Sequence, residues 1–173
     1  QIWKTSRRSL DLANPLVMAI LNVTPDSFSD GGKFADLDNA LRQAEKLISE
    51  GADIIDIGGE STRPGSKRVA AGDEIARTVP VIEAITKRFD TPVSIDTTKA
   101  EVADAAVNAG AEIINDISGL RFDASIADVA AKHKTGLVLM HSRGEFETLH
   151  SQPKIPDMMA EVAADFRRSI NAA

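Results

Sequence analysis

Polar residues that can bind a metal ion or an anion follow directly after short apolar runs in this chain. Residues 22–32 begin with Asn22 and carry two aspartates and several hydroxyl groups. The amide oxygen of Asn22 can coordinate a hard cation such as Mg²⁺. Residues 58–65 follow a second apolar run and carry Thr62 and Arg63 between glycines, and a hydroxyl with a guanidinium can contact phosphate oxygens. The residues alone also allow a plainer interpretation, in which both segments are ordinary turns and surface loops.

Two further polar residues end later apolar runs. The carboxylate of Asp96 can accept hydrogen bonds from a flat nitrogen heterocycle, and Asn115 offers a donor and an acceptor to the same kind of ring. Strand alternation predicts that Asp116 points the other way. Thr98 and Glu101 have the spacing of a capping box. That cap would leave Asp96 free to face the site.

These residues must be positioned by secondary-structure elements. Along the chain, short apolar runs alternate with segments of helical periodicity. This alternation predicts repeated βα units on a parallel sheet. The expected strands are residues 17–21, 53–57, 93–95, 112–115 and 137–140. The expected helices are residues 37–48, 73–89, 98–110, 123–134 and 156–170. We expect Pro80 to bend the second helix without breaking it, and a small hairpin in residues 1–14 to cover one end of the sheet.

Five βα units predict an α/β fold in one of two forms. The first is part of a TIM (β/α)8 barrel, which takes roughly 250 residues and keeps its chemistry at the carboxyl ends of its strands. The second is an open doubly wound sheet in which the fifth helix ends the domain. By its length, 173 residues, the chain is expected to lie in one domain.

Composition excludes several classes of function. The net charge of −6 and the pI near 5.1 argue against general binding of nucleic acid. The chain has no cysteine, which excludes disulfides and thiolate metal sites. It holds no run of about 18 apolar residues and no signal peptide, so we expect no membrane partner and take a cytoplasmic location as the default. The sequence begins with Gln1, which we interpret as not the natural start.

The two motifs in residues 22–32 and 58–65, each after its strand, resemble those of dihydropteroate synthase, the folate-pathway transferase that sulfonamides inhibit. The resemblance covers nearly the whole chain. It implies that residues 1–173 are the N-terminal portion of one pterin-binding barrel domain, with strands six to eight outside this sequence. It also implies a homodimer for the complete protein.

The resemblance further implies a reaction and its site. The amine of para-aminobenzoate displaces diphosphate from (7,8-dihydropterin-6-yl)methyl diphosphate and gives 7,8-dihydropteroate, with Mg²⁺ as cofactor. Asp96 and Asn115 would bind the pterin and support catalysis, Met140 would pack against the pterin, and Asn22 would bind the metal and the diphosphate. The other residues implied to contact the substrates are Phe28, Thr62, Arg63 and Pro64.

Several family segments do not follow in this sequence: an Asp-Pro-Gly loop, a Ser-Arg-Lys segment and a terminal Arg and His. We therefore expect the chain alone to be a poor catalyst. Two alternatives stay open, a catalytically inactive pterin-binding fragment and a barrel like the methyltetrahydrofolate:corrinoid methyltransferases. The loop motifs speak against the second. We interpret His141 as structural or loop-orienting, and Asp56 and Glu60 as barrel-interior groups that support the site.

Overall fold

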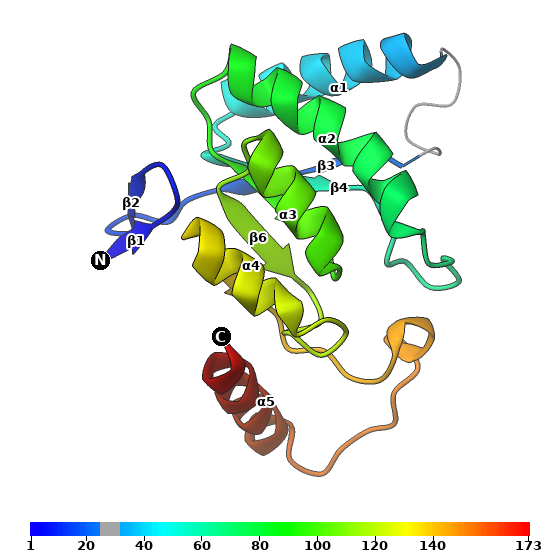
Figure 1. The fold of residues 1–173 in the computed structure, drawn as a ribbon. Helices are drawn as coiled ribbons and strands as arrows, with labels where there is room; N and C mark the ends of the chain where they lie inside the picture. Colours follow the sequence, from blue (N-terminus) through cyan, green and yellow to red (C-terminus); the bar gives the residue numbers. More distant parts are fainter. Residues whose placement is uncertain (25–31) are drawn as a thin grey trace.

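A parallel sheet of five strands forms the centre of the computed structural model, which describes residues 1–24 and 32–173 (Figure 1). The strand order is β3-β4-β5-β6-β7, so each strand pairs with the next one along the chain. The strands are β3 (Met18–Asn22), β4 (Ile54–Gly58), β5 (Val93–Asp96), β6 (Ile113–Asp116) and β7 (Gly136–Leu139).

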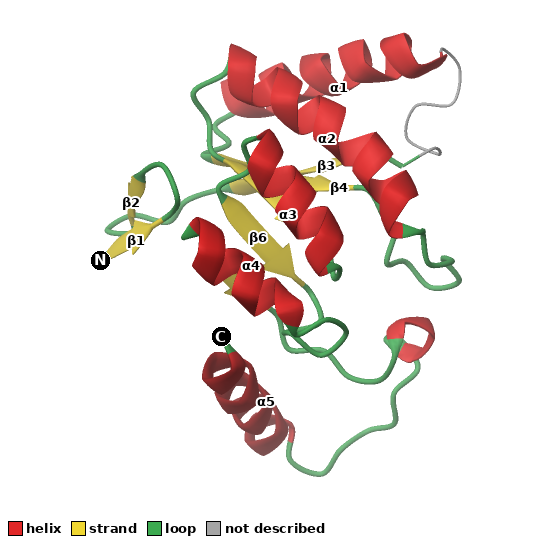
Figure 2. Cartoon of the chain, in the orientation of Figure 1, coloured by secondary structure: helices red, strands yellow, loops and turns green. Residues whose placement is uncertain are grey.

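Four helices connect these strands, and Figure 2 shows them along one side of the sheet. They are α1 (Gly32–Ser49), α2 (Ala71–Arg88), α3 (Ala100–Ala109) and α4 (Ser125–His133). A doubly wound sheet needs a reversal of strand order and helices on both faces. Here the order never reverses, and right-handed crossovers then place every connecting helix on the same face. This arrangement is the one found in barrels.

The apolar core lies between the sheet and these helices. Side chains alternate between the two faces of a strand, so every second strand residue enters this layer. Fully buried members from both layers are Ile57, Ile82, Ile95, Val102 and Ile114. Burial of each such side chain stabilises the fold by about 2 kcal/mol. The opposite face of the sheet stays available for polar side chains.

An antiparallel hairpin, β1 (Ile2–Lys4) with β2 (Ser9–Asp11), closes the amino-terminal end of the sheet, as predicted. The Trp3 ring fills the space beside Gly136, where an added Cβ would lie 2.7 Å from the ring. The carboxylate of Glu112, just before β6, accepts hydrogen bonds from Thr5 and Arg8. The hairpin therefore covers the end of the sheet opposite the predicted site.

After β7 the chain makes a short 3₁₀ turn, η2 (Phe146–Thr148), and ends in α5 (Met158–Ala172). The hydroxyl of Ser169 in α5 donates to the carbonyl of Gly119 at 2.8 Å. In the described part of the chain, no helix is long and apolar enough to cross a membrane.

The predicted elements are all present, but one predicted cap is wrong. α2 runs unbroken through Pro80, as expected. The capping box of Thr98 and Glu101 does not form, because α3 begins only at Ala100 and its cap position is Lys99, without a side-chain cap bond. The backbone N–H of Ala100 instead donates to the carboxylate of Asp123 at 2.7 Å. A charged acceptor from the next βα unit thus takes the place of the local cap.

Candidate functional site

One row of residues crosses the carboxyl ends of four neighbouring strands. Asn22 of β3 lies opposite Gly58 of β4, Gly58 lies opposite Asp96 of β5, and Asp96 lies opposite Asn115 of β6. Residues in register in a sheet share a face. The sheet therefore brings together three of the polar residues predicted to form the site, on the face away from the helices.

Gly58 leaves a gap in the middle of this row. A Cβ atom there would lie 3.2 Å from Oδ1 of Asn22 and 3.7 Å from Oδ2 of Asp96. These two side-chain oxygens thus flank Gly58 closely. The missing side chain allows a ligand to approach both oxygens at once.

Asn115 is oriented by a buried carboxylate beneath the row. Its Nδ2 atom donates to Oδ2 of Asp56 at 3.0 Å, and Asp56 is only 3% exposed. Burial raises the pKa of Asp56, and hydrogen bonds from Ser94 and Asn115 oppose that rise. With its amide nitrogen held by Asp56, Asn115 turns its carbonyl oxygen to the other side. The burial of Asp56 agrees with the interior position predicted for it.

Asp96 has an unusual protonation equilibrium. Burial raises its pKa to about 7, with further contributions from the negative charges of Asp56 and Glu74. A carboxyl group that titrates near neutral pH can accept or donate a hydrogen bond. Perturbed carboxyl groups of this kind concentrate at functional sites.

Asp116 takes no part in the site, as strand alternation predicted. Its carboxylate accepts the backbone N–H groups of Ser118 at 2.8 Å and Leu120 at 2.7 Å. The side chain is fully buried. It therefore shapes the turn after β6 on the helix side of the sheet.

Thr62 and Met140 line a common cavity of about 480 Å³. Thr62 is half-buried, and a ring nitrogen of His150 lies 2.6 Å from its carbonyl oxygen. Met140 follows the last residue of β7 and is 44% exposed. Arg63 and Pro64 are exposed. The cavity wall also includes Ile117, His141, Ser142 and Leu149.

His141 connects the segment after β7 to α5. Its Nδ1 atom lies 2.7 Å from a carboxylate oxygen of Asp165. Arg143 pairs with Glu161 of the same helix at 2.6 Å. These contacts agree with the structural role expected for His141.

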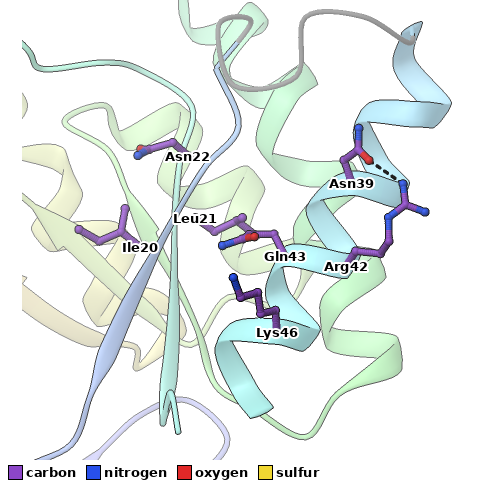
Figure 3. Close-up of a pocket in the computed structure, with 7 residues that line it drawn as sticks. All are labelled: Ile20, Leu21, Asn22, Asn39, Arg42, Gln43 and Lys46. Atoms are coloured by element: carbon purple, nitrogen blue, oxygen red, sulfur yellow. Dashed lines mark hydrogen bonds between the residues drawn. The ribbon is translucent and has the colours of Figure 1, made fainter. Parts of the chain in front are cut away.

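A second cavity, of about 560 Å³, lies between β3 and α1 (Figure 3). Its walls include Ile20, Leu21 and Asn22 of β3 and, from α1, Asn39, Arg42, Gln43 and Lys46. Figure 3 shows Ile20 and Asn22 on the side of the strand away from these α1 side chains. Asn22 thus shares this cavity wall with Arg42 and Lys46, but its side chain points to the other side of the strand.

The described residues fit a metal ion only if a substrate brings further ligands. Residues 1–24 and 32–173 contain no group of three or more His, Cys, Asp or Glu side chains that could hold a metal. Mg²⁺, however, keeps several waters and takes one or two protein oxygens together with substrate phosphates. Asn22 can supply one such oxygen. Phe28, predicted in the substrate pocket, lies outside the described residues.

Sequence reasoning missed the role of Gly58 in the row and the contact between Asp56 and Asn115. Strand alternation could have indicated the positions of Asp56 and Gly58, because residues two apart in a strand share a face. It also missed that Lys99 pairs with Glu60 and Glu74. Nothing in their spacing indicates that pairing.

Known proteins similar to this chain are dihydropteroate synthases. The enzyme of Bacillus subtilis (strain 168) is 53% identical over 157 residues, which are 91% of this chain and 54% of that protein. The crystal structure of the Yersinia pestis enzyme with a sulfonamide drug complex superposes with a TM-score of 0.87 at 44% identity, over 99% of this chain and 61% of that one. The structure of the Xanthomonas albilineans enzyme with 4-aminobenzoic acid superposes with a TM-score of 0.83 at 44% identity. This match covers 95% of this chain and 58% of that one.

This chain spans about half the length of the curated relatives it matches. Its structural neighbours are TIM barrels, so the five βα units form part of a barrel, as predicted. Residues 18–173 match the family described as "Pterin binding enzyme". That match covers the whole row of site residues, and the chain belongs to the pterin binding enzyme family.

Proposed function

We propose that the protein containing this chain is a dihydropteroate synthase. It would join (7,8-dihydropterin-6-yl)methyl diphosphate to para-aminobenzoate and release 7,8-dihydropteroate and diphosphate. The observation that carries this proposal is the row of Asn22, Gly58, Asp96 and Asn115 at the carboxyl ends of the strands. Relatives of 53% and 44% identity with this name support it.

Asp96 and Asn115 suit the pterin ring. The ring edge presents N–H donors and nitrogen or oxygen acceptors side by side, and a carboxyl group next to an oriented amide can match both. Asp56 holds the amide of Asn115 in one orientation. Positive charge that develops next to the ring during the reaction would be stabilised by the ionised form of Asp96.

Asn22 and Thr62 suit the diphosphate end of the same substrate. We propose that Asn22 supplies one oxygen ligand to Mg²⁺, which when bound would neutralise charge on the leaving diphosphate. Thr62 lies on the cavity wall with Met140, so its hydroxyl can position the diphosphate while Met140 packs on the pterin. The nitrogen of para-aminobenzoate forms a bond to the methylene carbon, the carbon–oxygen bond breaks, and one proton leaves the amine. This reaction needs no covalent enzyme intermediate.

Arg63 and Pro64 are proposed to border the second-substrate pocket together with Phe28. Their exposure leaves Arg63 able to meet the carboxylate of para-aminobenzoate. The Xanthomonas relative solved with 4-aminobenzoic acid supports this choice of substrate. The homodimer, the cytoplasmic location and inhibition by sulfonamides stay predictions.

The test uses the protein at its full encoded length. Dihydropteroate and diphosphate are both quantified, with and without para-aminobenzoate and with and without Mg²⁺. The proposal expects the two products in equal amounts, and only when para-aminobenzoate and Mg²⁺ are both present. Pterin binding without turnover would instead indicate a binding protein. Methyl transfer from a reduced folate to a corrinoid would indicate the methyltransferase alternative.

A further inference from the structure

The loop that carries Thr62 and Arg63 is closed into a ring at its base. One carboxylate oxygen of Glu60, Oε1, accepts the backbone N–H of Val69 at 2.5 Å. The same oxygen lies 3.0 Å from Nζ of Lys99. Glu60 therefore links the first and last residues of the segment 60–69 by a hydrogen bond. Lys99 contacts the same carboxylate oxygen that accepts this bond.

Lys99 is held in a buried group of charges. Its Nζ atom also lies 2.5 Å from Oε2 of Glu74, in the first turn of α2. The exposed side-chain fractions are 15% for Lys99, 6% for Glu60 and 0% for Glu74. Buried carboxylates need a partner, and removal of one member of such a group leaves an uncompensated charge. The ammonium group of Lys99 is the cation that pairs with Glu60 at this place.

The start of the loop is also fixed against α2, which makes its base rigid. A Cβ atom at Gly59 would lie 2.7 Å from Thr78 and 3.0 Å from Glu74, so only glycine fits this close approach. Arg77 donates to the carbonyl of Gly59 at 3.0 Å. Movement of the loop must therefore occur beyond Glu60, where Lys99 acts.

The residue before Val69 also contacts aromatic rings. The guanidinium of Arg68 lies 4.9 Å from the ring centroids of both Phe122 and Phe146. Cation–π contacts at exposed sites are weak, about 0.5 to 1 kcal/mol each. The buried contacts of Glu60 with Val69 and Lys99 therefore restrain the loop more strongly than the cation–π contacts of Arg68 do.

We propose that Lys99 is a positioning residue, which fixes Thr62 and Arg63 at the site by holding the base of their loop closed through Glu60. Lys99 follows Asp96 by three residues at the end of β5, so it connects the pterin end of the site to the loop proposed to meet the diphosphate. This inference rests on the proposed function for its effect on the substrate. Its effect on the loop does not depend on that function.

The test compares two variants, each made in the protein at its full encoded length. The double variant Lys99→Met with Glu74→Gln keeps Glu60 as the one charge of the group. Its net charge of −1 equals that of the natural group, one lysine against two glutamates. The control is Glu74→Gln alone, which keeps the contact between Lys99 and Glu60. Both variants lack the Glu74 charge, so any change that this loss causes at Asp96 is common to them.

The first measurement is the rate of trypsin cleavage after Lys67, which is exposed. A charge-assisted hydrogen bond contributes enough to change the opening equilibrium by about tenfold. We expect the double variant to be cut in this loop about ten times faster than the control, while the control matches the natural protein. Equal rates in the double variant and the control would overturn the proposal.

The second measurement separates positioning from a general loss of structure. We expect the double variant to have a KM for the pterin diphosphate about tenfold above that of the control, with kcat within about twofold. Affinity for 6-hydroxymethyl-7,8-dihydropterin, which has no diphosphate, should stay unchanged. Equal losses for both pterins would mean that Lys99 only supports the fold. A natural protein that does not bind pterin diphosphate would overturn the proposed function instead, and the cleavage comparison would still decide whether Lys99 holds the loop.

Discussion

The amide nitrogen of Asn115 donates a hydrogen bond of 3.0 Å to the carboxylate of Asp56, which is almost fully buried beneath it. Asp56 lies in β4 and Asn115 in β6, with β5 between them in the sheet, and the two residues are 59 positions apart in the chain. This bond fixes which end of the Asn115 amide faces the site. An amide free to flip would present the wrong group half of the time.

Loss of this bond should weaken pterin binding. In Asp56→Ala, Asn115 loses its orienting partner, and we expect the affinity for 6-hydroxymethyl-7,8-dihydropterin to fall by about tenfold, the size expected for a hydrogen bond to a charged group. Titration calorimetry measures this change. Asp128→Ala, at an exposed acidic residue of α4, is the control and should bind normally. Equal affinity in the two variants would contradict the assigned role of Asp56.

The absence of a side chain at Gly58 should be essential for turnover, because the diphosphate is proposed to bind beside Asn22. An added methyl group would press on Oδ1 of Asn22 at 3.2 Å, so Gly58→Ala should lower kcat/KM by about tenfold or more while the protein still folds. Gly72→Ala is a matched control, because nothing lies within 4 Å of an added Cβ there. Its place in the first turn of α2 predicts a gain in stability of up to about 1 kcal/mol. Unchanged kinetics in Gly58→Ala would show that substrate does not approach this gap.

Asp96 should make the protein less stable as the pH rises from about 4 to 7. Its folded-state pKa of about 7 lies above the ordinary value of 3.8, so the folded state binds more protons than the unfolded state within that window. The free energy of unfolding contributed by Asp96 is then fully present below pH 3.8 and is lost as the pH rises through 7. Denaturant unfolding at several pH values should show a shallower decline in Asp96→Asn. Parallel curves for the two proteins would exclude a raised pKa at Asp96.

The hairpin at the opposite end of the sheet should affect stability alone. Arg8 pairs with Glu112 at 2.9 Å, and Glu112 is only 2% exposed. Arg8→Ala leaves that carboxylate without its cation, and we expect a loss of about 3 kcal/mol in the free energy of unfolding with no change in pterin affinity. The neighbouring exposed residue provides the control variant Arg7→Ala, which should lose little. A change in pterin affinity in Arg8→Ala would contradict the separation of the two ends.

The sheet and its outward helices could be predicted from the sequence because the apolar runs are short and nearly continuous. Residues 53–57 and 112–115, for example, became β4 and β6 with shifts of one residue. The candidate residues Asn22, Asp96 and Asn115 followed from the same pattern, since strand ends in register must meet. Here local apolar pattern and tertiary structure agree.

Contacts between distant segments could not be predicted in the same way. The predicted cap at Thr98 failed because Asp123, 23 residues away from Ala100, supplies a charged acceptor to the helix. The pairing of Lys99 with Glu60 and Glu74 likewise depends on how α2, α3 and a loop pack together. Charged side chains are usually solvated, so sequence alone gave no reason to expect Glu60, Glu74 and Lys99 to be largely buried.

The most direct test of the account is a crystal structure of the protein at its full encoded length with a bound pterin diphosphate analogue. The account predicts the pterin ring against Asp96 and Asn115 on the face of the sheet away from the helices, with the diphosphate beside Asn22 and Thr62. A ring bound instead in the cavity between β3 and α1, next to Arg42 and Lys46, would contradict it.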